Sequence, residues 1–266
     1  MRIAFIGGGT MAEAMITGIL ERGLARPTDI AVGEPVEARR TALLQKFGVP
    51  AVSSNPQAAA GSELVVLSVK PQDLKAVLQD LRGVLRPGQV AVSIVAGARM
   101  ETIMQGLGYR QVVRVMPNTP AQVGMGMSVW TAAPEVPPER REQVRSLLRS
   151  FGEEVYVSDE KYLDMATALS ASGPAFVFLV IEALMDAGVH IGLPRDMARQ
   201  LAVQTVLGSA QMVKQTGRHP AELKNLVASP GGTTVEGLLA LEEGGVRAHF
   251  IRAVQNAYEK AKTLGA

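Results

Sequence analysis

The residues that could do chemistry gather in two glycine-containing loops, one near each end of the chain. In the second loop, residues 226–238 (LVASPGGTTVEGL) place Ser229, a Pro-Gly-Gly turn and two threonines directly before a predicted helix start. Hydroxyls and the free backbone N–H groups of a helix start can donate hydrogen bonds to an anion. A loop that only connected two helices would not need these residue types, so we treat it as a candidate binding site.

The first loop follows an apolar strand and opens a helix, with the pattern Gly7-x-Gly9-x-x-Ala12. Gly7 permits a tight turn, Gly9 lets the backbone approach a pyrophosphate, and Ala12 lets the helix pack close to the strand. The N–H groups at the helix start then face the phosphates. The pattern predicts a dinucleotide-binding loop, and the alternative is a strand-to-helix turn that is merely tight.

An acidic residue, Glu34, follows the second predicted strand. At this position a carboxylate accepts hydrogen bonds from a ribose 2′-hydroxyl and repels a 2′-phosphate, which favours NAD. Arg39 and Arg40 begin the next predicted helix and could pair with a phosphate instead. Glu34 could also be a solvated loop carboxylate, and these alternatives stay open.

Three other loops follow predicted strands, where doubly wound sheets bind ligands. Lys70 can place a positive charge beside a cofactor, and residues 93–97 (SIVAG) are small enough to leave room for a nicotinamide ring. Pro117 and Pro120 bracket Asn118 and would hold it in a defined direction. The alternative for Asn118 is a hydrogen bond to its own backbone in a rigid loop.

The composition is that of a globular protein with a substantial core. Of 266 residues, 47% are hydrophobic and 20% charged, and the net charge of +2 comes without a dense Lys/Arg run, which argues against nucleic acid as a partner. The absence of cysteine excludes disulfides and thiolate chemistry. The histidines lack metal-ligand spacing, so we expect no metal site; they are His190, His219 and His249.

No segment of the chain is expected to enter a membrane. The apolar run at the N-terminus is too short for a secretory signal. The most apolar later stretch, Pro174 to Leu184, contains Glu182 and is followed closely by Asp186, so we expect that it does not span a bilayer. These features predict a soluble, cytoplasmic protein.

Residues 1–158 alternate short apolar runs with helical patterns, which predicts a mostly parallel sheet with helices on both faces. The predicted strands are Arg2–Ile6, Ile30–Val32, Leu64–Ser68, Val90–Ile94, Val112–Met116, Ser128–Thr131 and Glu154–Val157. The predicted helices between them are Met11–Glu21, Val36–Phe47, Leu74–Arg82, Met100–Leu107 and Pro138–Ser150.

Residues 159–266 show only helical periodicity, so we expect a second, all-helical domain there. The predicted helices are Tyr162–Ser170, Ala175–Val189, Arg195–Thr216, Ala221–Leu226, Thr234–Glu243 and Arg247–Leu264. Their long apolar faces suggest that a second subunit buries part of this surface. Ser170, Ser172 and Gly173 precede Pro174 at a helix start, where small residues allow close helix packing or the approach of a ligand.

Taken together, these motifs resemble one family, the pyrroline-5-carboxylate reductases of proline biosynthesis. The resemblance covers essentially the whole chain and rests on IGGGTMAEA, VKP, MPNTPA, SASGPAFVF and ASPGGTT, in this order. It implies a Rossmann-like doubly wound, mostly parallel sheet followed by an all-helical dimerisation domain. Ala171 replaces a more usual glycine, and Glu34 departs from the Ser- or Arg-like residues that meet a 2′-phosphate in this family.

The resemblance implies that the chain reduces a C=N bond with NADPH or NADH and forms a homodimer or larger homo-oligomer. The implied cofactor-binding residues are Ile6, Gly7, Gly8, Gly9, Thr10, Met11, Glu34, Asn55, Ser68, Val69, Lys70, Pro71, Ile94, Val95, Ala96 and Asn118. The implied substrate-binding residues are Glu160, Ser229, Gly231, Gly232, Thr233 and Thr234.

The implied reaction transfers hydride to the C=N carbon of 1-pyrroline-5-carboxylate and gives L-proline. The loop from Ser229 to Thr234 would bind the substrate carboxylate, with Thr234 as the catalytic residue that hydrogen-bonds the imine nitrogen. A threonine hydroxyl is too weak an acid to supply the proton near neutral pH, so its role would be orientation and polarisation. Glu160 would stabilise the cationic nitrogen, unless it acts only on its own helix start.

Two other functions stay open on the sequence alone. One is a β-hydroxyacid dehydrogenase-like or general imine reductase of the same architecture, a class that usually relies on a lysine in the helical domain. Lys161, Lys214 and Lys224 are present there, but none lies in a recognisable motif. The other is a non-catalytic nucleotide sensor, which would have no need of the hydroxyl-lined loop.

Overall fold

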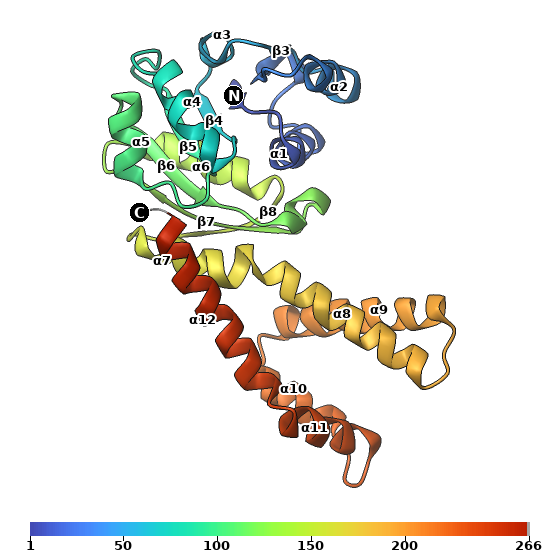
Figure 1. Ribbon diagram of the computed structural model, residues 1–266. Coiled ribbons are helices and arrows are strands. Elements are labelled where there is room, and N and C mark those ends of the chain that lie inside the picture. Colours follow the sequence, from blue (N-terminus) through green and yellow to red (C-terminus); the bar gives the residue numbers. More distant parts are fainter. Residues whose placement is uncertain (265–266) are drawn as a thin grey trace. The chain divides into compact units, whose positions relative to one another are not determined.

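The computed structural model describes residues 1–264 and divides into two compact units (Figure 1). The first unit is Met1–Ser172 together with the chain from Ala257 onward, and the second is Gly173–Asn256. The predicted boundary near residue 158 marks the change from strands to helices along the sequence. The compact units divide later because the first helix after that change packs on strands of the sheet.

The first unit is built on one eight-stranded sheet. Its strands are β1 (Ile3–Ile6), β2 (Ile30–Gly33), β3 (Ala51–Val52), β4 (Leu64–Leu67), β5 (Val90–Ser93), β6 (Val112–Met116), β7 (Gly126–Ala132) and β8 (Gly152–Tyr156). The spatial order is β3-β2-β1-β4-β5-β6-β7-β8. Each neighbouring pair is parallel except β6 and β7, which are antiparallel. The prediction of a mostly parallel sheet is therefore confirmed.

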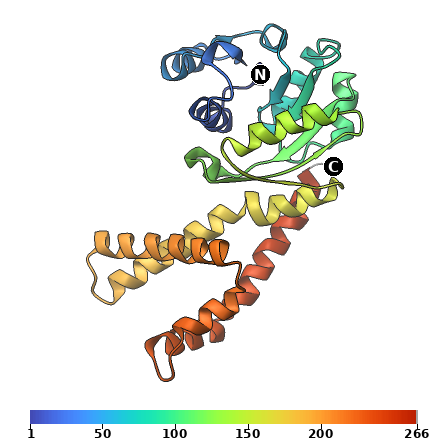
Figure 2. The ribbon, with the colours of Figure 1, turned by 180° about the vertical axis from the view of Figure 1, so that it is seen from behind.

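Helices cover both faces of this sheet, as Figure 1 and the reverse view in Figure 2 show. They are α1 (Thr10–Glu21), α2 (Glu37–Phe47), α3 (Asn55–Ala59), α4 (Leu74–Asp80), α5 (Met100–Leu107) and α6 (Pro138–Arg149). Side chains of α1, α2 and α6 form one core with β1 residues Ile3 and Phe5, whereas α3, α4 and α5 form the other with Ala4 and Ile6. This alternation follows from the strand period of two, and it explains why β1, β4 and β5 are apolar throughout.

One part of the first unit differs from the predicted elements. The segment after residue 50 holds the short strand β3 and the helix α3, neither of which was predicted. A two-residue strand and a five-residue helix are too short to show a period of two or 3.6. Ser54 caps α3 by accepting a hydrogen bond from the backbone N–H of Gln57 at 3.3 Å, and a proline follows at the second helical position.

The chain after β8 is helical in all the residues that the structure describes. The helices are α7 (Lys161–Ala166), a π-helical turn (Thr167–Ala171), α8 (Gly173–His190), α9 (Arg195–Thr216), α10 (Pro220–Val227), α11 (Thr233–Glu243) and α12 (Val246–Leu264). The predicted helix over Tyr162–Ser170 is thus partly a π-helix. Within the second unit, α8 and α9 pack along one another. The prediction of an all-helical second half holds for residues 161–264.

One helix passes a test for membrane spanning by length and composition alone. Residues 161–190 form a continuous helical segment with a mean hydropathy of 1.8 in its most apolar window. Our expectation that charges at Glu182 and Asp186 exclude a span was therefore too strong. An apolar helix that is covered by a second protein chain can have the same length and composition as a membrane-spanning helix. This finding is therefore weak evidence for a membrane.

Candidate active site

The carboxyl ends of five strands bring most of the predicted cofactor residues to one edge of the sheet. β1, β2, β4, β5 and β6 run parallel, so the loops that follow them lie at the same edge. The chain order reverses between β1 and β4, and a doubly wound sheet binds its ligand outside such a point. The predicted residues at this edge are Ile6–Met11, Glu34, Asn55, Ser68–Pro71, Ile94–Ala96 and Asn118.

The glycine loop has the shape that its sequence predicts. Gly7 has φ +97°, and a Cβ there would lie 2.9 Å from the backbone oxygen of Ser68, so only glycine fits. The Ser68 hydroxyl donates to the Gly7 carbonyl at 2.8 Å and so helps to hold the turn. At Gly9, by contrast, a Cβ would meet no atom within 4 Å. The space above Gly9 is open, as the approach of a pyrophosphate requires.

The carboxylate of Glu34 is almost fully buried and is already engaged by the protein. One oxygen accepts the backbone N–H of Gly8 and the other accepts that of Val36, both at 3.0 Å. A carboxylate has about four lone-pair sites, so Glu34 can still accept further hydrogen bonds from a ribose. The structure therefore shows that Glu34 holds the glycine loop, which the sequence did not indicate, and its contact with a ribose remains a prediction.

The two arginines that follow Glu34 are also bound to the loop region. Arg39 donates to the carbonyl of Gly8 and pairs with Glu13 at 2.9 Å. Arg40 donates to the carbonyl of Glu34 at 2.9 Å and to that of Pro35 at 2.7 Å. Both guanidiniums are therefore engaged by protein oxygens.

The remaining cofactor residues of the first unit differ in what they can offer. Asn55 lies against Gly33, where a Cβ would come within 2.6 Å of its side-chain oxygen. Lys70 and Pro71 are exposed at the edge of the sheet. Val95 is buried in the core under α4 and α5, so only its backbone can face a ligand. Its neighbours Ile94 and Ala96 are half-buried.

Glu160 is engaged by two partners in the first unit. Its carboxylate pairs with Arg114 and accepts the backbone N–H of Met100, the first residue of α5, at 2.6 Å. A carboxylate at a helix N-terminus is stabilised by the free N–H groups and the helix dipole. Glu160 therefore caps α5, and a substrate-binding role for it remains a prediction. Arg114 is buried on β6 and was missed, although an arginine inside the apolar run VVRVM is a signal for a buried ion pair.

Asn118 uses both ends of its amide on protein partners. Its oxygen accepts the backbone N–H of Met127 on β7 at 2.8 Å. Its nitrogen donates to the carbonyl of Ser170 at 3.2 Å and lies 3.4 Å from the hydroxyl of the same residue. The side chain of Asn118 is therefore engaged by protein partners, and a contact between Asn118 and the cofactor remains a prediction.

The predicted substrate loop lies in the second unit, between α10 and α11. Gly231 has φ +66°, and Gly232 donates its N–H to the carbonyl of Ser229 at 3.0 Å. A Cβ on Gly232 would lie 2.4 Å from the Ser229 hydroxyl, so the hydroxyl rests directly on the glycine. Gly232 is the N-cap of α11 and caps it without a side chain, so the helix start can donate to an anion. Thr233 is exposed and Thr234 half-buried in the first turn.

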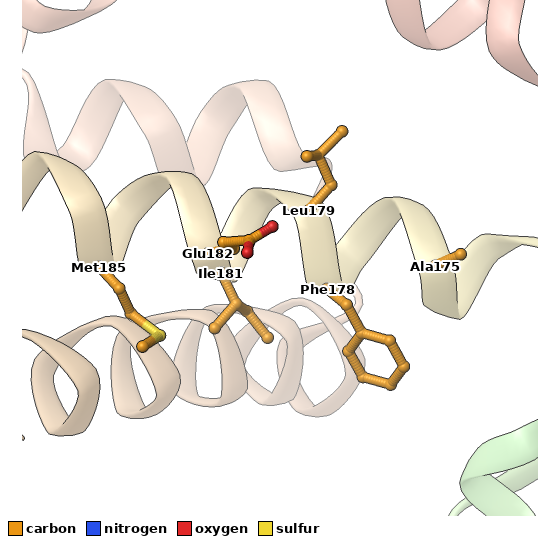
Figure 3. A pocket seen from close by; sticks show the side chains of 6 residues that line it. All are labelled: Ala175, Phe178, Leu179, Ile181, Glu182 and Met185. Carbon is orange, nitrogen blue, oxygen red and sulfur yellow. The ribbon is translucent and has the colours of Figure 1, made fainter.

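The second unit also carries a large apolar surface. Phe178 and Leu179 on α8 are 61% and 63% exposed. Figure 3 shows Phe178, Ile181 and Met185 pointing to the same side of this helix. These residues help to line a hollow of about 630 Å³. Among residues 1–264 no group of three or more acidic or histidine side chains is arranged to hold a metal ion.

Comparison with protein families identifies both parts of the chain. Residues 160–264 match the model of the family described as pyrroline-5-carboxylate reductase dimerisation. Residues 2–97 match the model described as NADP oxidoreductase, coenzyme F420-dependent. The first match covers the helical part with the hydroxyl-lined loop, and the second covers the glycine loop and the first five strands.

Known proteins are similar over the whole length. The pyrroline-5-carboxylate reductase of Synechocystis sp. is 43% identical over 266 residues, which is all of this chain and 98% of the relative. The solved structure of the pyrroline-5-carboxylate reductase from Coxiella burnetii matches with a TM-score of 0.93 at 36% identity, covering 100% of this chain and 98% of that one. The Plasmodium falciparum enzyme with NADP bound matches with a TM-score of 0.90 at 32% identity and the same coverage. With the glycine loop, the sheet edge and the Ser229–Thr234 loop in place, these matches show that the chain belongs to the pyrroline-5-carboxylate reductase family.

Proposed function

We propose that this protein reduces the C=N bond of 1-pyrroline-5-carboxylate to give L-proline, with the cofactor at the sheet edge of the first unit and the substrate on the loop before α11. The observation that carries the proposal is full-length similarity to pyrroline-5-carboxylate reductases at about 40% identity, combined with an intact Ser229–Thr234 loop. Membership of a family of biosynthetic enzymes supports a soluble protein, and we place it in the cytoplasm as part of this proposal.

The residues of the sheet edge fit a nicotinamide dinucleotide. The open space above Gly9 and the start of α1 suit a pyrophosphate, and the end of β2 suits the adenosine ribose. The small residues after β5 leave room for the nicotinamide ring, which supplies the hydride when the cofactor is bound. The protein's part in the reaction is then to orient the substrate and to stabilise charge.

The substrate loop supplies donors for a carboxylate without a formal positive charge. The N–H groups at the start of α11 and the Ser229 and Thr233 hydroxyls can bind the substrate carboxylate. Thr234 follows in the same turn, and we assign to its hydroxyl a hydrogen bond to the imine nitrogen. This bond orients the C=N group and polarises its carbon. The proton on nitrogen comes from solvent, or is already present because the substrate binds as the iminium.

The assay that tests the reaction follows NAD(P)H oxidation with 1-pyrroline-5-carboxylate. We expect turnover with this substrate and none in the reverse direction with NAD(P)⁺ and a 3-hydroxy acid. Turnover of the 3-hydroxy acid alone would support a β-hydroxyacid dehydrogenase-like enzyme. Cofactor binding without turnover of either substrate would support a nucleotide sensor.

We further propose that the protein prefers NADH to NADPH. The buried carboxylate of Glu34 lies at the end of β2, where it would repel a 2′-phosphate, and Arg39 and Arg40 are already paired with protein oxygens. The family includes an enzyme that was solved with NADP bound, so the preference rests on Glu34 and not on the family.

The preference is tested by titrating NADH and NADPH into wild type, Glu34→Ser and Glu37→Ser. For Glu34→Ser we expect the ratio of the two Kd values to move toward NADPH by about tenfold, which corresponds to ~1.4 kcal/mol. Because Glu34 also holds Gly8, both affinities can fall together, and the ratio isolates the effect on the phosphate. Glu37 is exposed in the first turn of α2 and controls for the general loss of a negative charge. An unchanged ratio in Glu34→Ser would show that Glu34 does not discriminate the two cofactors.

A further inference from the structure

The helix that follows β8 contains a π-helical turn at the end of the first unit. The backbone N–H of Ser172 donates to the carbonyl of Thr167, five residues earlier, at 2.9 Å. Single π-turns inside α-helices are rare and occur mainly at functional sites. The chain continues from this turn directly into α8, which starts at Gly173.

A proline leaves one carbonyl of this turn without its usual hydrogen-bond donor. In an α-helix the carbonyl of Ser170 would accept the N–H of residue 174. Residue 174 is proline, which has no N–H. A half-buried carbonyl without a donor is costly, so this oxygen needs a donor from elsewhere.

Asn118 supplies that donor. Its side-chain nitrogen donates to the carbonyl of Ser170 at 3.2 Å. The amide cannot be turned the other way, because its oxygen accepts the N–H of Met127 at 2.8 Å and a backbone N–H only donates. Pro117 and Pro120 restrict the backbone on both sides of Asn118. An amide is needed here, because an aspartate would keep the acceptor but lose the donor.

The position of Asn118 connects this bond to the cofactor site. Asn118 comes two residues after the end of β6, and β6 pairs with β5, whose end we assign to the nicotinamide ring. The turn that carries Ser170 and Ser172 is therefore held at the part of the sheet edge where hydride would be transferred. The other implied cofactor-binding residues follow β1, β2, β3 and β4.

We propose that Asn118 is a positioning residue of the reductase, which holds the Ser170–Ser172 turn against the end of β6 by donating the hydrogen bond that Pro174 cannot. This proposal rests on the reductase function proposed above. Asn118 acts through the turn and does not touch the cofactor or the substrate. Misplacement of reacting groups by about 1 Å can cost on the order of 100-fold in rate, which sets the size of effect to expect.

The test is a double-mutant cycle between Asn118→Ala and Pro174→Ala, with Asn118→Asp as a second variant. Pro174→Ala gives residue 174 an N–H, so the Ser170 carbonyl gains a donor within its own helix. In the wild-type background we expect Asn118→Ala and Asn118→Asp to lower kcat by about 10- to 100-fold. In the Pro174→Ala background the same changes should lower kcat by less than about threefold.

Two readouts separate positioning from direct binding. The Kd of NADH, measured by fluorescence titration, should stay within about threefold of wild type in Asn118→Ala. The primary deuterium isotope effect on kcat should rise, because hydride transfer becomes slower than the other steps. A loss of NADH affinity with an unchanged isotope effect would overturn the proposal in favour of direct cofactor binding. An equal loss of kcat in both backgrounds would also overturn it.

The same cycle can be followed without activity. Amide hydrogen exchange of residues 163–175 should increase in Asn118→Ala when residue 174 is proline, and should stay near its starting level when residue 174 is alanine. If wild type did not reduce 1-pyrroline-5-carboxylate, the proposed function would fail, yet exchange would still test whether Asn118 holds this turn. Equal exchange in Asn118→Ala and wild type would overturn the structural part.

Discussion

Gly7 and Gly9 lie two residues apart in one loop, yet a methyl group at each would meet different surroundings. At Gly7 the backbone has φ +97° and a Cβ would collide with Ser68 and Val69. At Gly9 the backbone is extended, with φ −75°, and the space is open. The two glycines therefore serve different purposes, one for the shape of the loop and the other for access to it.

We expect Gly7→Ala to lower the free energy of unfolding by at least about 1–2 kcal/mol, because an L-residue is strained at this φ and the Cβ meets backbone. Gly9→Ala should leave this free energy within about 0.5 kcal/mol of wild type but weaken NADH binding by about tenfold. Urea unfolding and NADH titration of both variants measure the two effects. Normal NADH binding by Gly9→Ala would show that the pyrophosphate does not bind next to Gly9.

We propose that the hydroxyl of Thr234 stabilises the transition state, because its hydrogen bond to the imine nitrogen would strengthen as the charge on that nitrogen changes. We therefore expect Thr234→Ala to lower kcat by about 100-fold, the order of effect for one such hydrogen bond, while NADH binds as in wild type. Thr234→Ser keeps a hydroxyl and should recover most of the activity. Steady-state kinetics with 1-pyrroline-5-carboxylate test this pair, and wild-type turnover by Thr234→Ala would refute the assignment.

Between elements, an ion pair ties the sheet to α6. Glu63 precedes β4 and accepts hydrogen bonds from Arg140 at 2.9 Å and Gln143 at 3.0 Å. Partial burial alone would raise the pKa of Glu63, but these hydrogen bonds outweigh it and hold the pKa below its ordinary value. A carboxyl group with a lowered pKa in the folded state contributes stability above its unfolded pKa, and this contribution is lost as the pH falls through the folded pKa.

We expect Glu63→Gln to lower the free energy of unfolding at pH 7 by about 0.5–1 kcal/mol, the usual range for a partly exposed pair. The difference from wild type should begin to shrink as the pH falls below the ordinary pKa of a glutamate, about 4.3, and should disappear only below the lowered pKa of the folded state, where the wild-type carboxyl is protonated in both states. Urea unfolding at several pH values measures it. Glu139→Gln, which removes a charge in the first turn of α6, is the control. A difference independent of pH would assign the effect of Glu63 to packing.

The elements that sequence alone predicts are those with a local cause. The apolar runs of β1, β4 and β5 and the turn at Gly7 are each determined by a few neighbouring residues. β3 and α3 were missed because they are too short to show a period. The π-turn was also missed, since Thr167–Ala171 lies within and just after the predicted helix Tyr162–Ser170, and one turn is too short to show a period of its own.

The candidate site shows the same limit, because several of its groups are fixed by partners far along the chain. Glu34 holds the N–H of Gly8, 26 residues away, and Asn118 holds Ser170, 52 residues away. Arg114 pairs with Glu160 across 46 residues. Residue types and motifs predicted which side chains lie near the site, but contacts between distant segments decide which of them remain available to a ligand.

At the scale of the whole molecule, the second unit lacks a core of its own. Among its described residues the buried apolar side chains are only Ala198, Ala202 and Leu223. Large apolar side chains are exposed on most of its helices, including Phe178 and Leu179 on α8 and Ile251 on α12. Residues 160–264 match the family model described as pyrroline-5-carboxylate reductase dimerisation. This match supports self-association through the exposed apolar surface.

A protein whose apolar surface is covered by a second copy is more stable at higher protein concentration. We therefore expect the thermal midpoint of wild type to rise with concentration and light scattering to give at least a dimer at micromolar concentration. Leu179→Glu places a charge on the exposed face of α8 and should favour the monomer and lower the midpoint. Leu44→Glu is the matched control, because Leu44 is a leucine of α2 in the first unit and is 55% exposed, close to the 63% of Leu179. A monomeric wild type, or equal effects of the two substitutions, would show that this surface of α8 does not mediate assembly.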